Sequence, residues 1–156
     1  MTIIDLSEQL DDIRSRYPEY WRSDEAEREL QILWGGADCN DCGVFERDET
    51  IRVDLECQKS WYGELHIAVA PNGWHTIATS HWYGQGGGGY APSLWNRIAY
   101  TTRDEAVAAG IDELIATFQR VRDPKAWAPS NQSALADRMI ETLKAYLSQT
   151  RQLSLF

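Results

Sequence analysis

The sequence predicts an α+β fold with two N-terminal helices, a small antiparallel sheet of three or more strands and two C-terminal helices. Three observations predict it: helical periodicity at both ends, alternating β-type runs between about residues 37 and 100, and an Asn72-Gly73 turn between two of these runs. Helices grouped apart from a strand meander are typical of α+β proteins. The 156 residues suit one domain, which we place at 1–149, followed by a flexible tail at 150–156.

Two N-terminal helices are predicted, each with a capping residue at its start and a helix-ending residue pair at its end. The first carries apolar residues at i, i+4 and i+7, follows the capping residue Asp5 and ends at Tyr17-Pro18. The second begins at Ser23, buries one apolar stripe and ends at Gly35-Gly36. The two apolar sets are Leu6, Leu10 and Ile13, then Ala26, Leu30 and Leu33.

The strand region contains one isolated strand and one hairpin. Residues 50–57 alternate between apolar and charged, which indicates a half-buried strand. The runs 63–70 and 74–82 flank Pro71-Asn72-Gly73, and an Asn-Gly pair between alternating runs is typical of a hairpin. An even-numbered loop would give the hairpin a polar and an apolar face, whereas an odd-numbered loop would abolish this arrangement. The polar set is Glu64, His66, His75 and His81, and the apolar set is Leu65, Ile67, Val69, Trp74, Ala78 and Trp82.

Two further helices follow the strands. A capping box of Thr102 and Glu105 opens the first, which ends at Asp123-Pro124. The second starts near Ser130 or Asn131 and runs out around Ser148-Gln149. Their buried stripes are Val107, Ile111, Leu114, Ile115 and Phe118, then Leu135, Met139, Leu143 and Leu147.

The net charge of −9 argues against a protein that grips nucleic acid over a broad basic face. The charge is uneven, because residues 1–56 hold 16 acidic and 6 basic side chains while residues 57–156 hold 8 and 9. The N-terminus lacks the features of a secretory signal, and no apolar run approaches the ~18 residues that span a bilayer. Because the number of cysteines, three, is odd, we expect free thiols and a cytoplasmic location. From the lack of a long apolar run we expect no membrane partner.

The last five residues carry large apolar groups that a mobile polar terminus usually lacks. They either fold back onto the core or bind a partner. The sequence Gln152-Leu153-Ser154-Leu155-Phe156 resembles, at all five positions, the pentapeptide by which bacterial replication and repair proteins dock on the DNA polymerase III β sliding clamp.

The resemblance implies a role for each of the five residues. Gln152 would occupy the polar end of the clamp groove and Leu153 would make a shallow contact. Ser154 would fill a tolerant position, while Leu155 and Phe156 would enter the deep apolar pocket. It therefore implies a small non-enzymatic accessory or modulator of DNA replication or repair, of a size suited to a phage or plasmid, with a second protein as a further partner of the folded body.

The cysteines and histidines give weaker signals of a metal. Cys39 and Cys42 form a C-x2-C pair, which supplies half of a tetrahedral zinc site. Cys57 and His66 would complete it only at irregular spacing, so no cofactor is expected and zinc is the alternative. The polar face with Glu64, His66, His75 and His81 is a second candidate for metal binding or proton transfer, and the solvated face of a sheet is its simpler interpretation.

The glycine-rich segment 82–95 contains a formal G-x-G-x-x-G, but no helix opens directly after it. A dinucleotide fingerprint needs that helix, so we reject this interpretation. The remaining expectation is a flexible loop that connects sheet and helix or closes over a ligand. Its candidate ligand-binding residues are Tyr83, Gly86, Gly87, Gly88, Gly89 and Tyr90.

Two other functions compete with clamp binding. An acidic inhibitor that mimics DNA, directed against a host nuclease or restriction system, would use the charge of residues 1–56. A small metal protein or enzyme would use the Cys39 and Cys42 pair or the Glu64, His66 and His81 face.

Overall fold

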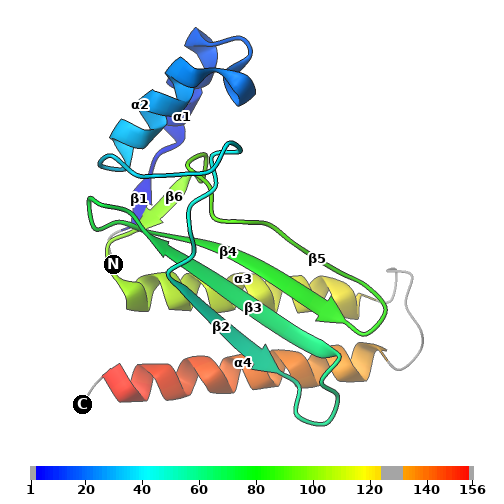
Figure 1. Ribbon diagram of the computed structural model, residues 1–156. Coiled ribbons are helices and arrows are strands. Elements are labelled where there is room, and N and C mark those ends of the chain that lie inside the picture. The colour runs from blue at the N-terminus through cyan, green and yellow to red at the C-terminus, as the bar shows by residue number, and fades with distance from the viewer. Residues whose placement is uncertain (1–2, 124–131, 155–156) are drawn as a thin grey trace. The chain divides into compact units, whose positions relative to one another are not determined.

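The computed structural model describes residues 3–123 and 132–154 (Figure 1). The described residues confirm the α+β fold, with four helices and a six-stranded antiparallel sheet ordered β1-β6-β4-β3-β2 and with β5 paired to β4. The elements are β1 (Ile3–Asp5), α1 (Ser7–Arg16), the 3-10 turn η1 (Tyr20–Arg22), α2 (Asp24–Leu33), β2 (Glu49–Asp54), β3 (Trp61–Val69), β4 (His75–Tyr83), β5 (Gly87–Gly89), β6 (Ile98–Tyr100), α3 (Arg103–Arg122) and α4 (Gln132–Ser154).

The contacts divide the chain into two compact units. Unit 1 comprises Met1–Thr50, His66–Ala78 and Ala91–Ala106, and unit 2 comprises Ile51–Leu65, Thr79–Tyr90 and Val107–Phe156. One domain over residues 1–149 with a flexible tail remains a prediction.

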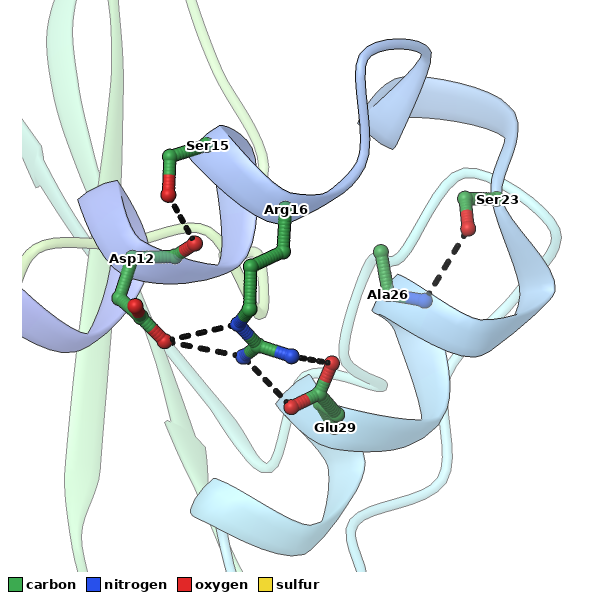
Figure 2. A network of polar contacts seen from close by, with 6 residues as sticks. All are labelled: Asp12, Ser15, Arg16, Ser23, Ala26 and Glu29. Atoms are coloured by element: carbon green, nitrogen blue, oxygen red, sulfur yellow. Dashed lines mark hydrogen bonds and ion pairs between the residues drawn. The ribbon is translucent and has the colours of Figure 1, made fainter.

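Of the two predicted cap residues, Ser23 is the N-cap of α2, whereas Leu6 holds the N-cap position of α1 and Asp5 lies one residue before it. The Asp5 carboxylate accepts a hydrogen bond from the backbone N–H of Ser7 at 2.9 Å, and the Ser23 hydroxyl accepts one from Ala26 N–H at 3.2 Å. Arg16 joins the two helices, because its guanidinium binds Asp12 of α1 and both carboxylate oxygens of Glu29 in α2 (Figure 2).

The core of unit 1 is apolar and includes Trp34, which the predicted stripe of the second helix left out. Trp34 follows the last residue of α2, is fully buried, and donates its indole N–H to the carbonyl of Leu94 at 2.9 Å. It packs edge-to-face on Phe45 and Trp74, with ring centroids 5.2 and 5.8 Å apart. The buried cluster consists of Leu6, Leu10, Ile13, Ala26, Leu30, Trp34, Ala37, Phe45, Ala68, Ala70, Leu94 and Ala99.

Unit 2 packs α3 on β3. Thr102, which precedes α3, caps it as predicted by accepting from the backbone N–H of Glu105 at 3.2 Å, while the Glu105 carboxylate accepts from the Thr101 hydroxyl at 3.0 Å. Of the predicted stripe, Val107, Ile111, Leu114 and Phe118 are buried, while Ile115 is half-buried. In α4 the buried stripe is Ala136, Met139, Ile140, Leu143 and Leu147, and Leu135 is half-buried. The predicted helix start near residues 130 and 131 lies outside the described residues.

The predicted end of α4 around Ser148-Gln149 is wrong, because the helix continues to Ser154. No Gly or Pro occurs between residues 148 and 154 to end it. The Thr150 hydroxyl also donates to the Tyr146 carbonyl at 3.0 Å, one turn back. The first three residues of the motif therefore belong to the last helical turn.

Candidate functional site

The predicted clamp-binding segment begins on the exposed last turn of α4. Leu147 is buried and Thr150 is half-buried, whereas Arg151, Gln152 and Leu153 are exposed. Leu153 is 78% exposed, whereas Leu143 and Leu147 of the same helix are buried. Ser154 ends the helix, and the predictions for Leu155 and Phe156 fall outside the described residues.

The described start of the segment is accessible to a partner. Leu147 is the last buried residue of α4 and Thr150 is half-buried, whereas Gln152 and Leu153 lie on the exposed last turn. The last four carbonyls of a helix lack intrahelical partners, and terminal turns fray readily. Gln152 and Leu153 therefore lie exposed to solvent at a helix end.

The candidate zinc ligands are divided between the units. Cys39 and Cys42 lie in unit 1, and Cys57 lies in unit 2. The Cys39 thiol donates to Glu27 at 3.4 Å, and burial together with this carboxylate raises its pKa to about 11. Cys42 and Cys57 are exposed, and the Cys57 sulfur accepts from the Arg138 guanidinium at 3.5 Å. All three thiols are free.

His66, the fourth candidate ligand, is buried at 2% exposure beside Arg47 and Thr50. Its Nδ1 lies 3.2 Å from the Thr50 hydroxyl and 3.4 Å from the Arg47 guanidinium. Within residues 3–123 and 132–154, no three His, Cys, Asp or Glu side chains form a group that could hold a metal ion. The expectation of no cofactor, with zinc as the alternative, remains a prediction.

The predicted polar face with Glu64, His66, His75 and His81 is wrong. Ala70 N–H donates to the Trp74 carbonyl at 2.8 Å, which closes a three-residue loop over Pro71-Asn72-Gly73 with Gly73 at φ 86°. This odd-numbered loop shifts the register by one residue relative to the predicted even loop. Even-numbered residues of β3 therefore share a face with even-numbered residues of β4, and odd-numbered residues share the other face.

The contacts of the two strands show the consequence of this register. Leu65 of β3 faces Gly110 of α3, and His81 of β4 lies against Phe118 of α3, with ring centroids 5.9 Å apart. Glu64, one residue from Leu65, points the opposite way and lies 3.6 Å from Arg52 of β2. Glu64 and His66 therefore lie on one face of the hairpin and His81 on the other. Val69 and Trp82 of the predicted apolar face are not buried either, at 43% and 39% exposure.

The expected flexible loop is partly a strand. Gly87–Gly89 form β5, which pairs antiparallel with residues 80–82 of β4. A tight turn joins them, with Tyr83 N–H donating to the Gly86 carbonyl at 2.8 Å and Gly84 at φ 84°. A Cβ on Gly89 would lie 2.5 Å from Ser80 Cβ, so the glycines permit close approach of the strands. Tyr83 and Tyr90 flank β5, and their role as ligand-binding residues remains a prediction.

A polar cluster around Glu113 of α3 was not predicted from the sequence. The Glu113 carboxylate accepts from the Thr79 hydroxyl at 2.6 Å and from the Tyr90 hydroxyl at 2.8 Å. Burial and the positive charge of Arg120 lower the pKa of nearby His81. The residues come from three separate segments, namely β4, the segment after β5, and α3. The sequence therefore contains no motif that would reveal the cluster. The two hydroxyl bonds join Glu113 of α3 to β4 and to the segment after β5.

No family model, no curated protein and no solved structure matches this chain. In the part of the chain that the structure describes, no helix is long and apolar enough to cross a membrane. Within the described residues, the last turn of α4 exposes Gln152 and one large apolar side chain, Leu153.

Proposed function

We propose that this protein is a small, cytoplasmic, non-enzymatic accessory or modulator of DNA replication or repair. It docks on the bacterial sliding clamp through residues 152–156. The observation that supports the proposal is the exposure of Gln152 and of Leu153, which is 78% exposed, in a segment that matches the clamp-binding pentapeptide at every position.

The physics of peptide recognition favours such a role. A short segment gains affinity by placing a few apolar anchors in a preformed groove, and it loses part of that free energy when it becomes ordered. Because Gln152 and Leu153 are already exposed, binding would bury these side chains without first removing them from the core. The complex is therefore expected to be reversible.

The charge distribution is compatible with a role at DNA through a protein. Residues 57–156 hold 8 acidic and 9 basic side chains, so the end that carries the motif has no excess of negative charge. The acidic first part would be repelled by phosphates, and a clamp would therefore bring the protein to DNA.

Retention on immobilised β clamp tests the proposal. We expect the full chain to be retained, and a chain that ends at Arg151 to be lost. Gln149→Ala alters an exposed side chain of the same helix outside the motif, so it serves as a control that should be retained like the wild type. Equal retention of the full and shortened chains would reject clamp binding through this segment.

The acidic-inhibitor alternative gains no specific support. Mimicry of DNA requires a row of unpaired carboxylates, yet six of the acidic residues in positions 1–56 form ion pairs with arginine. The six are Asp11, Asp12, Glu19, Glu29, Glu49 and Asp54. The alternative of a metal protein or enzyme loses the shared Glu64, His66 and His81 face because of the hairpin register, and its Cys39 and Cys42 route gains no specific support.

A further inference from the structure

The turn between α1 and α2 exposes a tryptophan. Trp21 is the middle residue of η1 and is 64% exposed. Its ring meets Tyr20 edge-on, with centroids 5.2 Å apart, so part of one edge is supported while most of the indole lies in solvent. Tryptophan is the residue type most enriched among binding hot spots, because it buries a large area with few rotatable bonds.

Tyr20, which contacts Trp21, is itself held by an aromatic ring and a guanidinium group. Tyr20 packs on Trp95 with centroids 5.1 Å apart, and the Arg14 guanidinium lies 4.9 Å from the Tyr20 ring and 5.2 Å from the Trp95 ring. These contacts fix the turn before any partner arrives. A partner would therefore not have to supply the free energy of ordering it.

A hollow of about 540 Å³ lies along the same turn. Its lining includes the Tyr17 side chain and two carboxylates, Glu19 and Glu25. Glu19 is bound to Arg22 at 2.7 Å, whereas Glu25 accepts only the Ser23 hydroxyl at 3.2 Å and has no ion pair among the described residues. The hollow therefore has one negative charge left for an incoming cation.

The other acidic residues of unit 1 add to the negative electrostatic potential around Glu25. The stretches of unit 1 contain 16 acidic and 7 basic residues, while those of unit 2 contain 8 of each. The net charge of −9 thus belongs to unit 1 alone. A positively charged surface would be attracted to unit 1 and would associate faster at low salt.

We infer that Trp21 and the hollow beside it, together the η1 surface, form a docking site for a basic protein surface that offers an apolar recess to Trp21 and a lysine or arginine to Glu25. This site lies apart from residues 152–156 in sequence and serves a second partner, whatever the outcome for the clamp. Acidic residues in the first turn of α2 also stabilise the helix dipole, which accounts for Glu25 but not for an exposed Trp21.

The test titrates the full-length 15N-labelled protein with a synthetic peptide of alternating arginine and leucine, followed by NMR. We expect saturable shifts of the Trp21 indole N–H and the Glu25 amide. The apparent affinity should fall at least about fivefold as NaCl rises from about 50 mM to about 300 mM. Shifts of equal size at exposed acids elsewhere in unit 1, such as Glu8 and Asp38, would overturn the proposal, because they would show general attraction only.

Matched variants separate the site from the overall charge. Glu25→Gln and Glu8→Gln each remove one negative charge, and we expect at least about a fivefold loss of affinity for the first and less than about a twofold loss for the second. Trp21→Ala should lose at least about tenfold and keep the fold, since the side chain is outside the core. Equal affinity of Trp21→Ala and wild type would reject the site. Concentration-dependent Trp21 shifts without peptide would also reject it, in favour of a second copy of this chain.

Discussion

A Cβ atom added to Gly110 of α3 would overlap the side chain of Leu65 in β3. Leu65 is fully buried, and Gly110 lies within a helix of 20 residues where glycine is otherwise unfavourable. The glycine is therefore required for the close approach of helix and strand at the centre of unit 2. Gly63 repeats the relationship, because its added Cβ would lie 3.1 Å from Leu114.

Gly110→Ala should destabilise the protein by about 1–3 kcal/mol, because overpacking against Leu65 outweighs the ~1 kcal/mol that alanine gains in a helix. Urea denaturation measures the change. In a Leu65→Ala background the overlap is absent, so the same substitution should become neutral or stabilising. A cost that is equal in both backgrounds would contradict the account.

Thr79→Val should cost about 1–2 kcal/mol, because it removes a hydroxyl donor 2.6 Å from Glu113 at a nearly buried position. Tyr90→Phe should cost less, since Tyr90 is 46% exposed and water can replace its hydrogen bond. Chemical denaturation of both variants provides the comparison. Larger destabilisation by Tyr90→Phe would show that the cluster is not organised as described.

His81 should make stability depend on pH. Burial and the Arg120 charge lower its pKa below the ordinary value of about 6.5, so the unfolded chain takes up a proton more readily than the folded one. The stabilisation is complete above about pH 6.5 and declines as pH falls below it. Denaturation midpoints at several pH values should show this decline, and His81→Gln should flatten it. An identical pH profile for the variant would argue against the assignment.

The three thiols should react at different rates. A pKa of about 11 leaves Cys39 as roughly one part in a thousand thiolate at pH 8, and the thiolate is the reactive form. We expect iodoacetamide to modify exposed Cys42 and Cys57 well before Cys39, as followed by peptide mass spectrometry. Glu27→Gln should speed modification of Cys39 by removing the neighbouring negative charge. Rapid alkylation of Cys39 in the wild type would contradict this environment.

The sequence predicted the helices well because local signals determine them. Ser23 and Thr102 cap helices as expected, and the apolar stripes at Leu10 and Ile111 are buried. β1 and β6 were not predicted, since each has only three residues and no periodicity can develop over that length. Their pairing, such as Ile4 with Ala99, depends on residues far apart in the chain.

The candidate sites were less predictable, because they depend on register and on contacts between distant segments. One residue in the loop length at Gly73 separated Glu64 from His81 and removed the predicted polar face. The bonds between Glu113 and Tyr90 join positions 23 apart without a motif. Only the segment 152–156 was recognisable beforehand, since its chemistry lies in consecutive residues.

Competition for the clamp groove tests the central proposal most directly. A fluorescent peptide with the sequence Gln-Leu-Ser-Leu-Phe is bound to purified β clamp, and the full-length protein is titrated in while anisotropy is measured. We predict that the wild type displaces the peptide, and that a variant with Leu155→Ala and Phe156→Ala displaces it at least about tenfold less well. Failure of the wild type to displace the peptide, or equal displacement by the variant, would contradict clamp binding through residues 152–156.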